Sequence, residues 1–231
     1  MLSDTLTRPG VTEAILGRRS VRAFLPSPVP ETLIREILDL ARYAPSGSNM
    51  QPWFVNVLAG DALEALKAAV KVRIPDNPAG EGAPFTIYPE AMSKASAQRR
   101  SRRGEDMYAL LGIPRENKVG RIMQFARNYD LFGAPMGLFF SIDRVWDKPQ
   151  WAHLGMFIHS IMLLAHERGL ATCAQESWAG FHPTVTKMLD LPESRIFYCG
   201  MAIGYADPDA PVNALAQDRI GLDEFSAWRL D

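Results

Sequence analysis

Two short segments near the start of the chain carry the side chains best suited to chemistry. In the first, Arg18, Arg19, Ser20 and Arg22 place guanidinium groups beside a hydroxyl, a combination that suits a phosphate group. The second, residues 45–52, is dense in small hydroxyl, amide, glycine and proline residues, which present backbone N–H groups and short polar groups. Together the two segments suggest a phosphorylated cofactor with a heteroaromatic head.

Each segment also has an interpretation without a ligand. The arginines could form a solvated basic turn at the end of a helix, where cations suit the helix dipole. Residues 45–52 could be an ordinary connection between a helix and a strand. The residue types alone therefore leave both a binding site and a plain connection open.

Hydrophobic periodicity predicts the elements that must position these side chains. Apolar residues at helical spacing, with one proline near the start and another past the end, predict a helix over 30–43. Asp61 is the expected N-cap of the next helix. Further helices are expected at 11–18, 61–72, 92–110, 115–129, 151–168 and 184–189, and strands at 53–58, 137–142 and 195–203.

Several regions have a less ordinary pattern. The helix at 151–168 is apolar almost all round, which predicts burial in the centre or at a subunit interface, and Gly169 is expected to end it. Residues 169–174 are interpreted as this helix end running into a loop. Residues 75–128, the cap segment, begin with a long loop rich in proline and glycine, as lids and binding loops often do. Residues 206–231, the C-terminal arm, are expected to pack on something, for example a partner subunit.

Composition excludes several classes of function. A chain of 231 residues that is 47% hydrophobic can form one domain with a full core. The net charge of −1 favours neither nucleic acid nor a membrane, and the histidines form no metal-binding pattern. Cys173 and Cys199 have apolar neighbours, which indicates buried thiols in a reducing cytoplasm, with a disulfide as the alternative. Residues 1–7 lack the pattern of a secretory signal, and no stretch is apolar enough to span a membrane.

The order and spacing of the two segments resemble the nitroreductase family, whose members are FMN-dependent homodimers. The family's Arg-x-Ser-x-(Arg/Lys) signature corresponds to Arg18, Ser20 and Arg22. Its Pro-Ser-x-x-Asn-x-Gln-Pro-Trp segment corresponds to residues 45–53, with Pro45, Ser46, Asn49, Gln51, Pro52 and Trp53 at the matching positions. The resemblance covers nearly the whole chain. It implies a single FMN-binding domain over 1–231, with an α+β fold, a central mostly antiparallel sheet flanked by helices, and an intertwined homodimer.

The resemblance also implies roles for these residues. Arg18 and Ser20 would contact the FMN phosphate, and Arg22 would lie along the ribityl chain or near the pyrimidine edge of the ring. Arg19 would contribute backbone or ribityl contacts. In the second segment, the residues expected to reach FMN bound mainly by the partner subunit are Pro45, Ser46, Gly47 and Asn49, while Gln51 would approach the ring or hold the loop.

Two later positions complete the implied cofactor site. Gln175, Glu176 and Ser177 would lie against the flavin near N5, where a backbone N–H of Glu176 or Ser177 can donate to N5; Ser177 stands where a glycine is common. Arg219 matches the arginine of a C-terminal Lys-x-Arg that reaches the phosphate, and Gln217 stands where the lysine would be. Without the resemblance, residues 175–178 read as a polar connection and Arg219 as a surface arginine paired with Asp218 or Asp223.

Residues that could bind the reductant or the acceptor lie mostly in the cap segment. This segment contains a basic cluster, Arg99, Arg100, Arg102 and Arg103. The cluster could be a solvated helix face. Alternatively, it could bind the NADPH 2′-phosphate or an anionic nitrobenzoate. Candidate cleft aromatics, with a core role as the alternative for most, are Phe85, Tyr88, Tyr108, Phe125, Tyr129 and Trp178.

The expected reaction is a ping-pong, two-electron transfer. NAD(P)H gives a hydride to flavin N5, the product leaves, and an electron-poor acceptor such as a nitroaromatic compound takes the same place. The flavin carries the chemistry, so no side chain need act as an acid or base, and a positive edge from Arg22 could stabilise the reduced ring. Quinones, enones and halogenated aromatics stay open as acceptors, as do a flavin-binding protein without significant turnover and an anion-binding protein without flavin.

Overall fold

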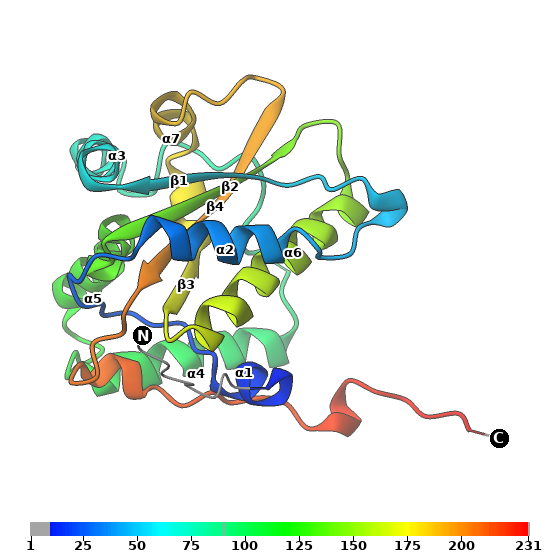
Figure 1. The fold of residues 1–231 in the computed structure, drawn as a ribbon. Helices are drawn as coiled ribbons and strands as arrows, with labels where there is room; N and C mark the ends of the chain where they lie inside the picture. Colours follow the sequence, from blue (N-terminus) through cyan, green and yellow to red (C-terminus); the bar gives the residue numbers. More distant parts are fainter. Residues whose placement is uncertain (1–9, 90, 231) are drawn as a thin grey trace, which may run out of the picture.

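A four-stranded sheet forms the centre of the protein (Figure 1). The computed structural model describes residues 10–89 and 91–230; residues 1–7, on which the expectation of no secretory signal rests, lie outside this part. The sheet has the order β1-β2-β4-β3, and every pair of neighbours is antiparallel. This confirms the expected antiparallel sheet. Its strands are β1 (Phe54–Ala59), β2 (Met136–Asp143), β3 (Ala171–Gln175) and β4 (Arg195–Gly204).

The sheet separates two hydrophobic cores. Along β2, side chains alternate between the faces, as the pleat of a strand requires. Leu138 and Phe140 enter the core that contains helices α2 (Glu31–Ala41) and α6 (Lys148–Glu167). Phe139 enters the opposite core. The strand is buried on both faces, so apolar side chains occupy consecutive positions, as at Leu138, Phe139 and Phe140.

Helices α2 and α6 cover one face of the sheet, and they were both expected. Burial of Ile34, Ile37 and Ala41 confirms the amphipathic stripe of α2. At the end of α6, Gly169 adopts φ +73° and its N–H donates to the carbonyl of His166 at 3.0 Å. This is the expected left-handed stop, which glycine adopts without steric cost.

The other face is covered by α3 (Gly60–Arg73), α7 (His182–Met188) and the short helix η2 (Arg127–Gly133). The expectation that Asp61 caps α3 is wrong. The N-cap is Ala59, and Asp61 lies inside the first turn, where its negative charge still suits the helix dipole.

The interpretation of residues 169–174 as a helix end running into a loop is also wrong, because a strand follows the helix stop. Ala171–Gln175 forms β3, which pairs with β4 from Ala171 opposite Gly204 to Gln175 opposite Gly200. The short helix η3 (Glu176–Gly180) follows it. Because β3 starts directly after the helix stop and lacks an alternating pattern, periodicity does not reveal it.

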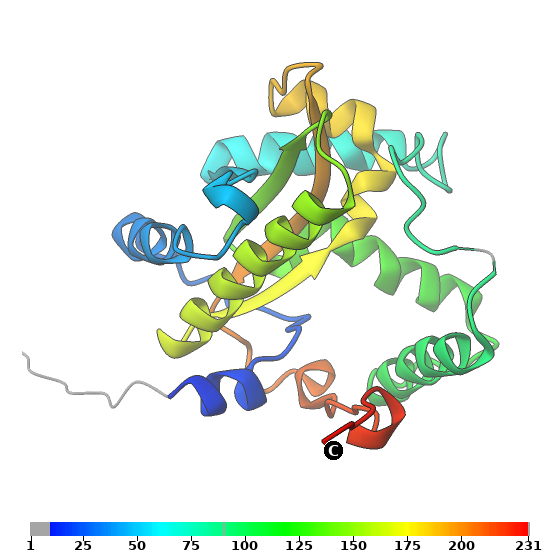
Figure 2. The same cartoon turned by 90° about the vertical axis from the view of Figure 1, so that its right-hand side faces the viewer.

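The cap segment leaves the sheet after α3. It carries α4 (Lys94–Leu110) and α5 (Lys118–Ala126), and Figure 2 shows α4 apart from the sheet with the C-terminal arm beside it. The arm holds the short helices η4 (Pro211–Ala214) and η5 (Leu222–Glu224), while α1 (Val11–Gly17) packs against α6. Among the residues that the structure describes, no helix is both long and apolar enough to cross a membrane.

Gly200 is required by the packing of the core. A Cβ at this position would lie 2.8 Å from Cδ1 of Trp178, whose side chain is fully buried. We expect Gly200→Ala to lower the free energy of unfolding by about 1–3 kcal/mol, since overpacking forces neighbours out of place. Gly104→Ala is the control, because a Cβ there has no neighbour within 4 Å and alanine favours the helix by about 1 kcal/mol. Urea unfolding of both variants measures the difference; equal stabilities would contradict the packing described.

Candidate functional site

The arginine segment is fixed to the edge of the sheet. After α1 ends, the chain runs beside β3, where Ser20 forms a parallel bridge with Thr172 and the Val21 N–H donates to the Thr172 carbonyl at 3.1 Å. Val21 is buried in the core. Because side chains alternate along an extended segment, Ser20 and Arg22 face away from this core.

The C-terminal arm returns to the same place. The Gln217 side chain donates from Nε2 to the backbone carbonyl of Arg18, and Arg219 donates from Nη2 to Oε1 of Gln217 at 2.8 Å. No salt bridge joins Arg219 to Asp218 or Asp223 in the described structure; Arg219 donates instead to the backbone carbonyl of Asp218 at 2.7 Å. The structure thus brings Arg18 and Arg219 together from opposite ends of the chain.

The backbone of Arg22 is held by a residue that the sequence analysis missed. The Arg22 N–H donates to Oδ1 of Asn213 at 2.9 Å, and Asn213 donates to the carbonyl of Ala23 at 2.9 Å. Asn213 lies in η4 of the C-terminal arm. No local pattern could have found it, because the contact spans most of the chain.

The basic cluster of α4 divides among three surroundings. Arg100 lies over the ring of Tyr88, with Cζ 4.0 Å from the ring centroid. Arg102 lies within 3.9 Å of carboxylate oxygens of Asp106 and Asp218. Arg103 instead reaches the C-terminal arm.

Arg103 joins the arginines of the cofactor segment. Its Nη1 donates to the carbonyl of Ala216. Burial, and then the charges of Arg22 and Arg219, lower the pKa of Arg103 below its usual value. Burial and the charge of Arg219 lower the pKa of Arg18 in the same way. Arg18, Arg22, Arg103 and Arg219 therefore lie close enough to repel one another, and we call them the four-arginine cluster.

The carboxylates of Asp106 and Asp218 partly offset the charge of Arg103, but neither forms a salt bridge with it in the described structure. None of its arginines forms a salt bridge with a described carboxylate. Guanidinium groups recognise phosphate oxygens through paired N–H donors. The cluster is therefore an anion site whose chemistry fits a phosphate group.

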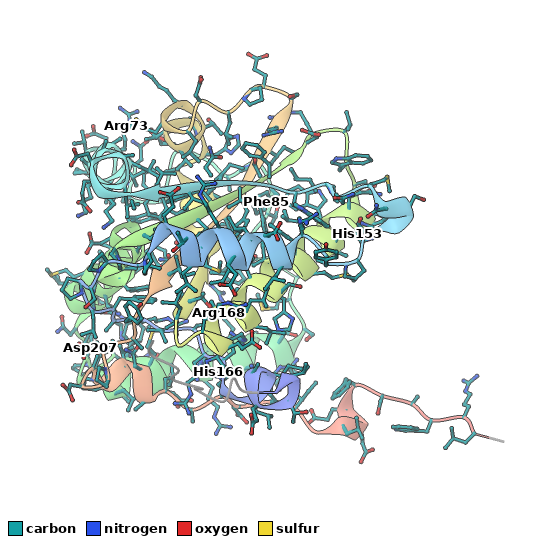
Figure 3. All side chains as sticks on the ribbon, in the orientation of Figure 1. Arg73, Phe85, His153, His166, Arg168 and Asp207 are labelled. Atoms are coloured by element: carbon teal, nitrogen blue, oxygen red, sulfur yellow. The ribbon has the colours of Figure 1, made fainter. Side chains whose placement is uncertain are left out.

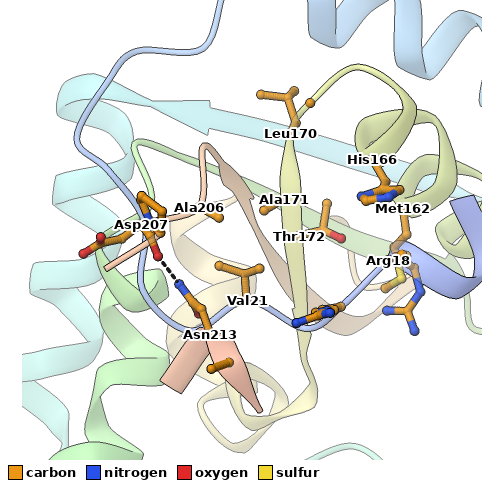
Figure 4. A pocket seen from close by; sticks show the side chains of 15 residues that line it. Arg18, Val21, Met162, His166, Leu170, Ala171, Thr172, Ala206, Asp207 and Asn213 are labelled. Atoms are coloured by element: carbon orange, nitrogen blue, oxygen red, sulfur yellow. Dashed lines mark hydrogen bonds between the residues drawn. The ribbon is translucent and has the colours of Figure 1, made fainter. Parts of the chain in front are cut away.

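Two cavities meet beside this cluster. The first, of about 480 Å³, is lined by Arg18, Arg19 and Met162; Figure 4 shows Arg18 beside Met162 and His166, with Asn213 and Asp207 across the space. The second, of about 710 Å³, is also lined by Met162, so this side chain borders both cavities. Predicted site residues in the second cavity are Arg22, Tyr88, Phe125, Gln175, Glu176 and Ser177.

The second cavity contains buried polar atoms that need a partner. Gln175 is only 3% exposed, and its Nε2 donates to the carbonyl of Asn128 at 2.8 Å. Its Oε1 and the Ser177 Oγ are buried without a hydrogen-bond partner in the described structure. Buried polar groups are nearly always hydrogen-bonded, so these atoms fit the polar edge of a bound ring. The carboxylate of Glu176 is already engaged, since it accepts from the Tyr198 hydroxyl at 2.9 Å.

The amide-rich segment lies elsewhere in the same chain. Gly47 donates from its N–H to Nε2 of His153 at 3.3 Å, near the start of α6. The arginine segment lies near the other end of α6, where Gly17 packs against His166; Figure 3 labels both histidines. The rise of an α-helix places these two ends about 20 Å apart. Within one chain, Pro45, Ser46, Gly47, Asn49 and Gln51 therefore do not join the four-arginine cluster.

The candidate aromatics also separate. Tyr88 and Phe125 line the second cavity and are 56% and 52% exposed. Tyr129 and Trp178 are buried in the core with their rings 5.7 Å apart. We therefore assign Trp178 and Tyr129 to the core and not to the acceptor cleft. The other two make internal ring contacts, Phe85 with Trp151 and Tyr108 with Arg121.

Two further groups can be placed. Cys173 and Cys199 are free and buried, as expected, and burial raises the pKa of Cys173 to about 11, so this thiol stays protonated at neutral pH. No His, Cys, Asp and Glu side chains within 10–89 and 91–230 are grouped to hold a metal ion.

Comparison with known proteins identifies the family. The profile described as the nitroreductase family matches residues 15–205. The chain belongs to the nitroreductase family. This confirms the resemblance drawn from the arginine and amide-rich segments.

Individual nitroreductases are similar over nearly the whole chain. A 4-nitrobenzoate reductase of Pseudomonas putida is 41% identical over 205 residues, which cover 89% of each chain. A chloronitrobenzene nitroreductase of Comamonas testosteroni is 35% identical over 223 residues, 96% of this chain and 98% of the relative. Among solved structures, the FMN and NADPH-dependent nitroreductase NfnB from Sphigopyxis sp. strain HMH has a TM-score of 0.94 and 44% identity, covering 96% of this chain and all of that one. NfnB from Mycobacterium smegmatis, solved with NADPH, has a TM-score of 0.90 and 30% identity over 95% of this chain and 97% of that one.

Proposed function

We propose that this protein is an FMN-dependent nitroreductase that uses NADPH or NADH to reduce nitroaromatic compounds by two electrons. The observation that carries the proposal is the pair of cavities that share Met162. Arg18 and Arg19 line the first, and Arg22 and the residues with unpartnered polar atoms, Gln175 and Ser177, line the second. The similar nitroreductases named above support the same cofactor, reductant and class of acceptor.

The residues of this chain bind and orient the cofactor. Arg18, Ser20 and Arg219 hold the phosphate, with Arg19 beside them. Arg22 lines the second cavity, so its charge would stabilise negative charge on the pyrimidine edge. FMN, when bound, supplies the hydride chemistry at N5.

The residues after β3 hold the ring. Gln175 and Ser177 would offer their unpartnered atoms to its polar edge, and a backbone N–H of Glu176 or Ser177 would donate to N5. No side chain of this chain is assigned to act as an acid or base. The residues after β3 bind the ring, fix its orientation and leave one of its faces open.

We further propose a homodimer whose partner completes the site. The segment 45–51 lies about a helix length from its own cluster, and it presents Ser48, Asn49 and Gln51 with positive φ on the surface. Exposed apolar side chains lie on α1 and around the end of α2, namely Val11, Ile15, Leu16, Leu40 and Tyr43. Burial of this surface against a second copy would bring Pro45, Ser46, Gly47, Asn49 and Gln51 to that copy's FMN.

The organisation of the chain follows from this site. A single FMN-binding domain spans 1–231, with the cap segment 75–128 over the cofactor and the C-terminal arm 206–231 closing the phosphate end. The free thiols of Cys173 and Cys199 suit the reducing cytoplasm.

Redox titration of the purified protein tests the proposed function. We expect a yellow protein that NADPH or NADH bleaches without oxygen and that 4-nitrobenzoate then restores, because both partners use one cofactor in turn. The visible spectrum follows each step. A colourless protein that FMN cannot reconstitute would contradict the flavin assignment. If quinones restore the yellow colour of the bleached protein and nitro compounds do not, the acceptor is a quinone and not a nitroaromatic compound.

The acceptor side of the second cavity favours an anionic nitro compound. Arg100 lines this cavity beside Tyr88, and no salt bridge to it occurs in the described structure. We expect Arg100→Ala to raise KM for 4-nitrobenzoate about 10-fold, the scale of one charge-assisted hydrogen bond, while KM for nitrobenzene changes little. Steady-state kinetics with both acceptors measures this.

Arg99→Ala is the matched control for Arg100→Ala. Arg99 is exposed on the same helix, and its Nη2 donates to the Ser96 hydroxyl at 3.3 Å. We expect it to leave both KM values unchanged. If Arg100→Ala raises KM for NADPH but not for 4-nitrobenzoate, Arg100 binds the reductant, and our assignment of Arg100 to the acceptor is wrong.

A further inference from the structure

The phosphate end of the site contains an arginine that comes from the cap segment. Arg103 lies on α4, far from the arginine segment in sequence, and donates to the carbonyl of Ala216 in the C-terminal arm. Ala216 directly precedes Gln217, whose side chain bridges the Arg18 carbonyl and the Arg219 guanidinium. Position 217 therefore holds a neutral amide between Arg18 and Arg219, and Arg103 contacts the residue before it.

We propose that Arg103 is a direct ligand of the FMN phosphate and that α4 thereby forms part of the cofactor site. This inference rests on the proposed function, because it requires FMN. Arg103 and Arg219 also line one cavity of about 650 Å³ between α4 and the C-terminal arm. Arg99, Arg102 and the carboxylates of Asp106, Asp218 and Glu224 line the same cavity, so its lining is mixed in charge and Arg103 and Arg219 border a common space.

Comparison with neighbouring arginines singles out Arg103. Arg121, on α5, is paired with both carboxylate oxygens of Glu105 at 2.8 and 2.7 Å. Arg102 has two carboxylates within 3.9 Å. Arg103 has no salt bridge in the part of the chain that the structure describes, and one backbone carbonyl occupies only one of its five N–H donors.

Electrostatics favours a ligand over a purely structural role. Arg103 is partly buried, and the charges of Arg22 and Arg219 lower its pKa more than the nearby carboxylates of Asp106 and Asp218 raise it. Anchoring the C-terminal arm to α4 would need only a neutral donor. A phosphate group, with about two negative charges and three terminal oxygens, would offset the repulsion and use the remaining donors.

Flavin binding with and without the phosphate tests this role. Apoprotein is titrated with FMN and with riboflavin, and quenching of flavin fluorescence gives Kd. We expect Arg103→Ala to weaken FMN at least about 10-fold, the scale of a lost hydrogen bond between charged groups, and riboflavin less than about 2-fold. Arg103→Lys keeps the charge without the fork and should fall between. Arg102→Ala, one position away, should leave both values near wild type.

A second variant moves the charge instead of removing it. Gln217→Lys places a cation next to Arg18 and Arg219, where the amide now lies. In the Arg103→Ala background it should restore most of the FMN affinity and leave riboflavin unchanged. Circular dichroism and Tm confirm that each variant is folded.

Two results would overturn the inference. Equal weakening of FMN and riboflavin by Arg103→Ala, without rescue by Gln217→Lys, would make Arg103 an anchor of the C-terminal arm. Unchanged FMN affinity would remove it from the site altogether. Wild-type protein that binds neither flavin would instead refute the proposed function and this inference with it, so the two failures are distinguishable.

Discussion

Repulsion within the four-arginine cluster is the constraint on which the rest of this site depends. Arg18, Arg22, Arg103 and Arg219 come from three separated parts of the chain and meet without a salt bridge in the described structure. Like charges at short range destabilise the folded state. The chain holds them together through neutral links, which are the Thr172, Asn213, Gln217 and Ala216 hydrogen bonds. A bound phosphate would turn this repulsion into attraction.

The edge strand β3 sets the distance between the two ends of the proposed site. Thr172 holds the arginine segment through its carbonyl, and Glu176 begins the turn at the ring end. A strand rises about 3.3 Å per residue, so these two points lie about 13 Å apart. The phosphate end and the ring end are therefore held on one rigid element, and both cavities lie along it. A short strand that periodicity does not reveal thus positions most of the site.

Some of this could be predicted from the sequence because the signals are local. The stripe of Ile34, Ile37 and Ala41 and the glycine stop at Gly169 depend on neighbours within two turns. The residues at the ends of the site could be placed only by their likeness to a family. Nonlocal contacts carried no signal: the bond from Arg22 to Asn213 spans most of the chain.

The basic cluster illustrates the same limit. Arg100, Arg102 and Arg103 are near neighbours on one helix, and in sequence they form a single positive run. Arg100 and Arg103 are three residues apart and share one helix face, yet Arg100 lines the second cavity and Arg103 reaches the C-terminal arm, while Arg102 lies near carboxylates. The contacts of these arginines can be assigned only when the position of α4 relative to the rest of the chain is known.

Complementation between two defective copies tests most directly the claim that each site is shared by two chains. One variant carries Arg18→Ala and Arg219→Ala, and the other carries Ser46→Asp and Asn49→Asp; both are expressed together with different tags, and the mixed dimer is purified. FMN content is measured for each species. We expect both parental proteins to lack FMN and the mixed dimer to bind one FMN per two chains, because one of its sites has both parts intact. A mixed dimer as empty as its parents, or full FMN binding by the second parent, would contradict a site built from two chains.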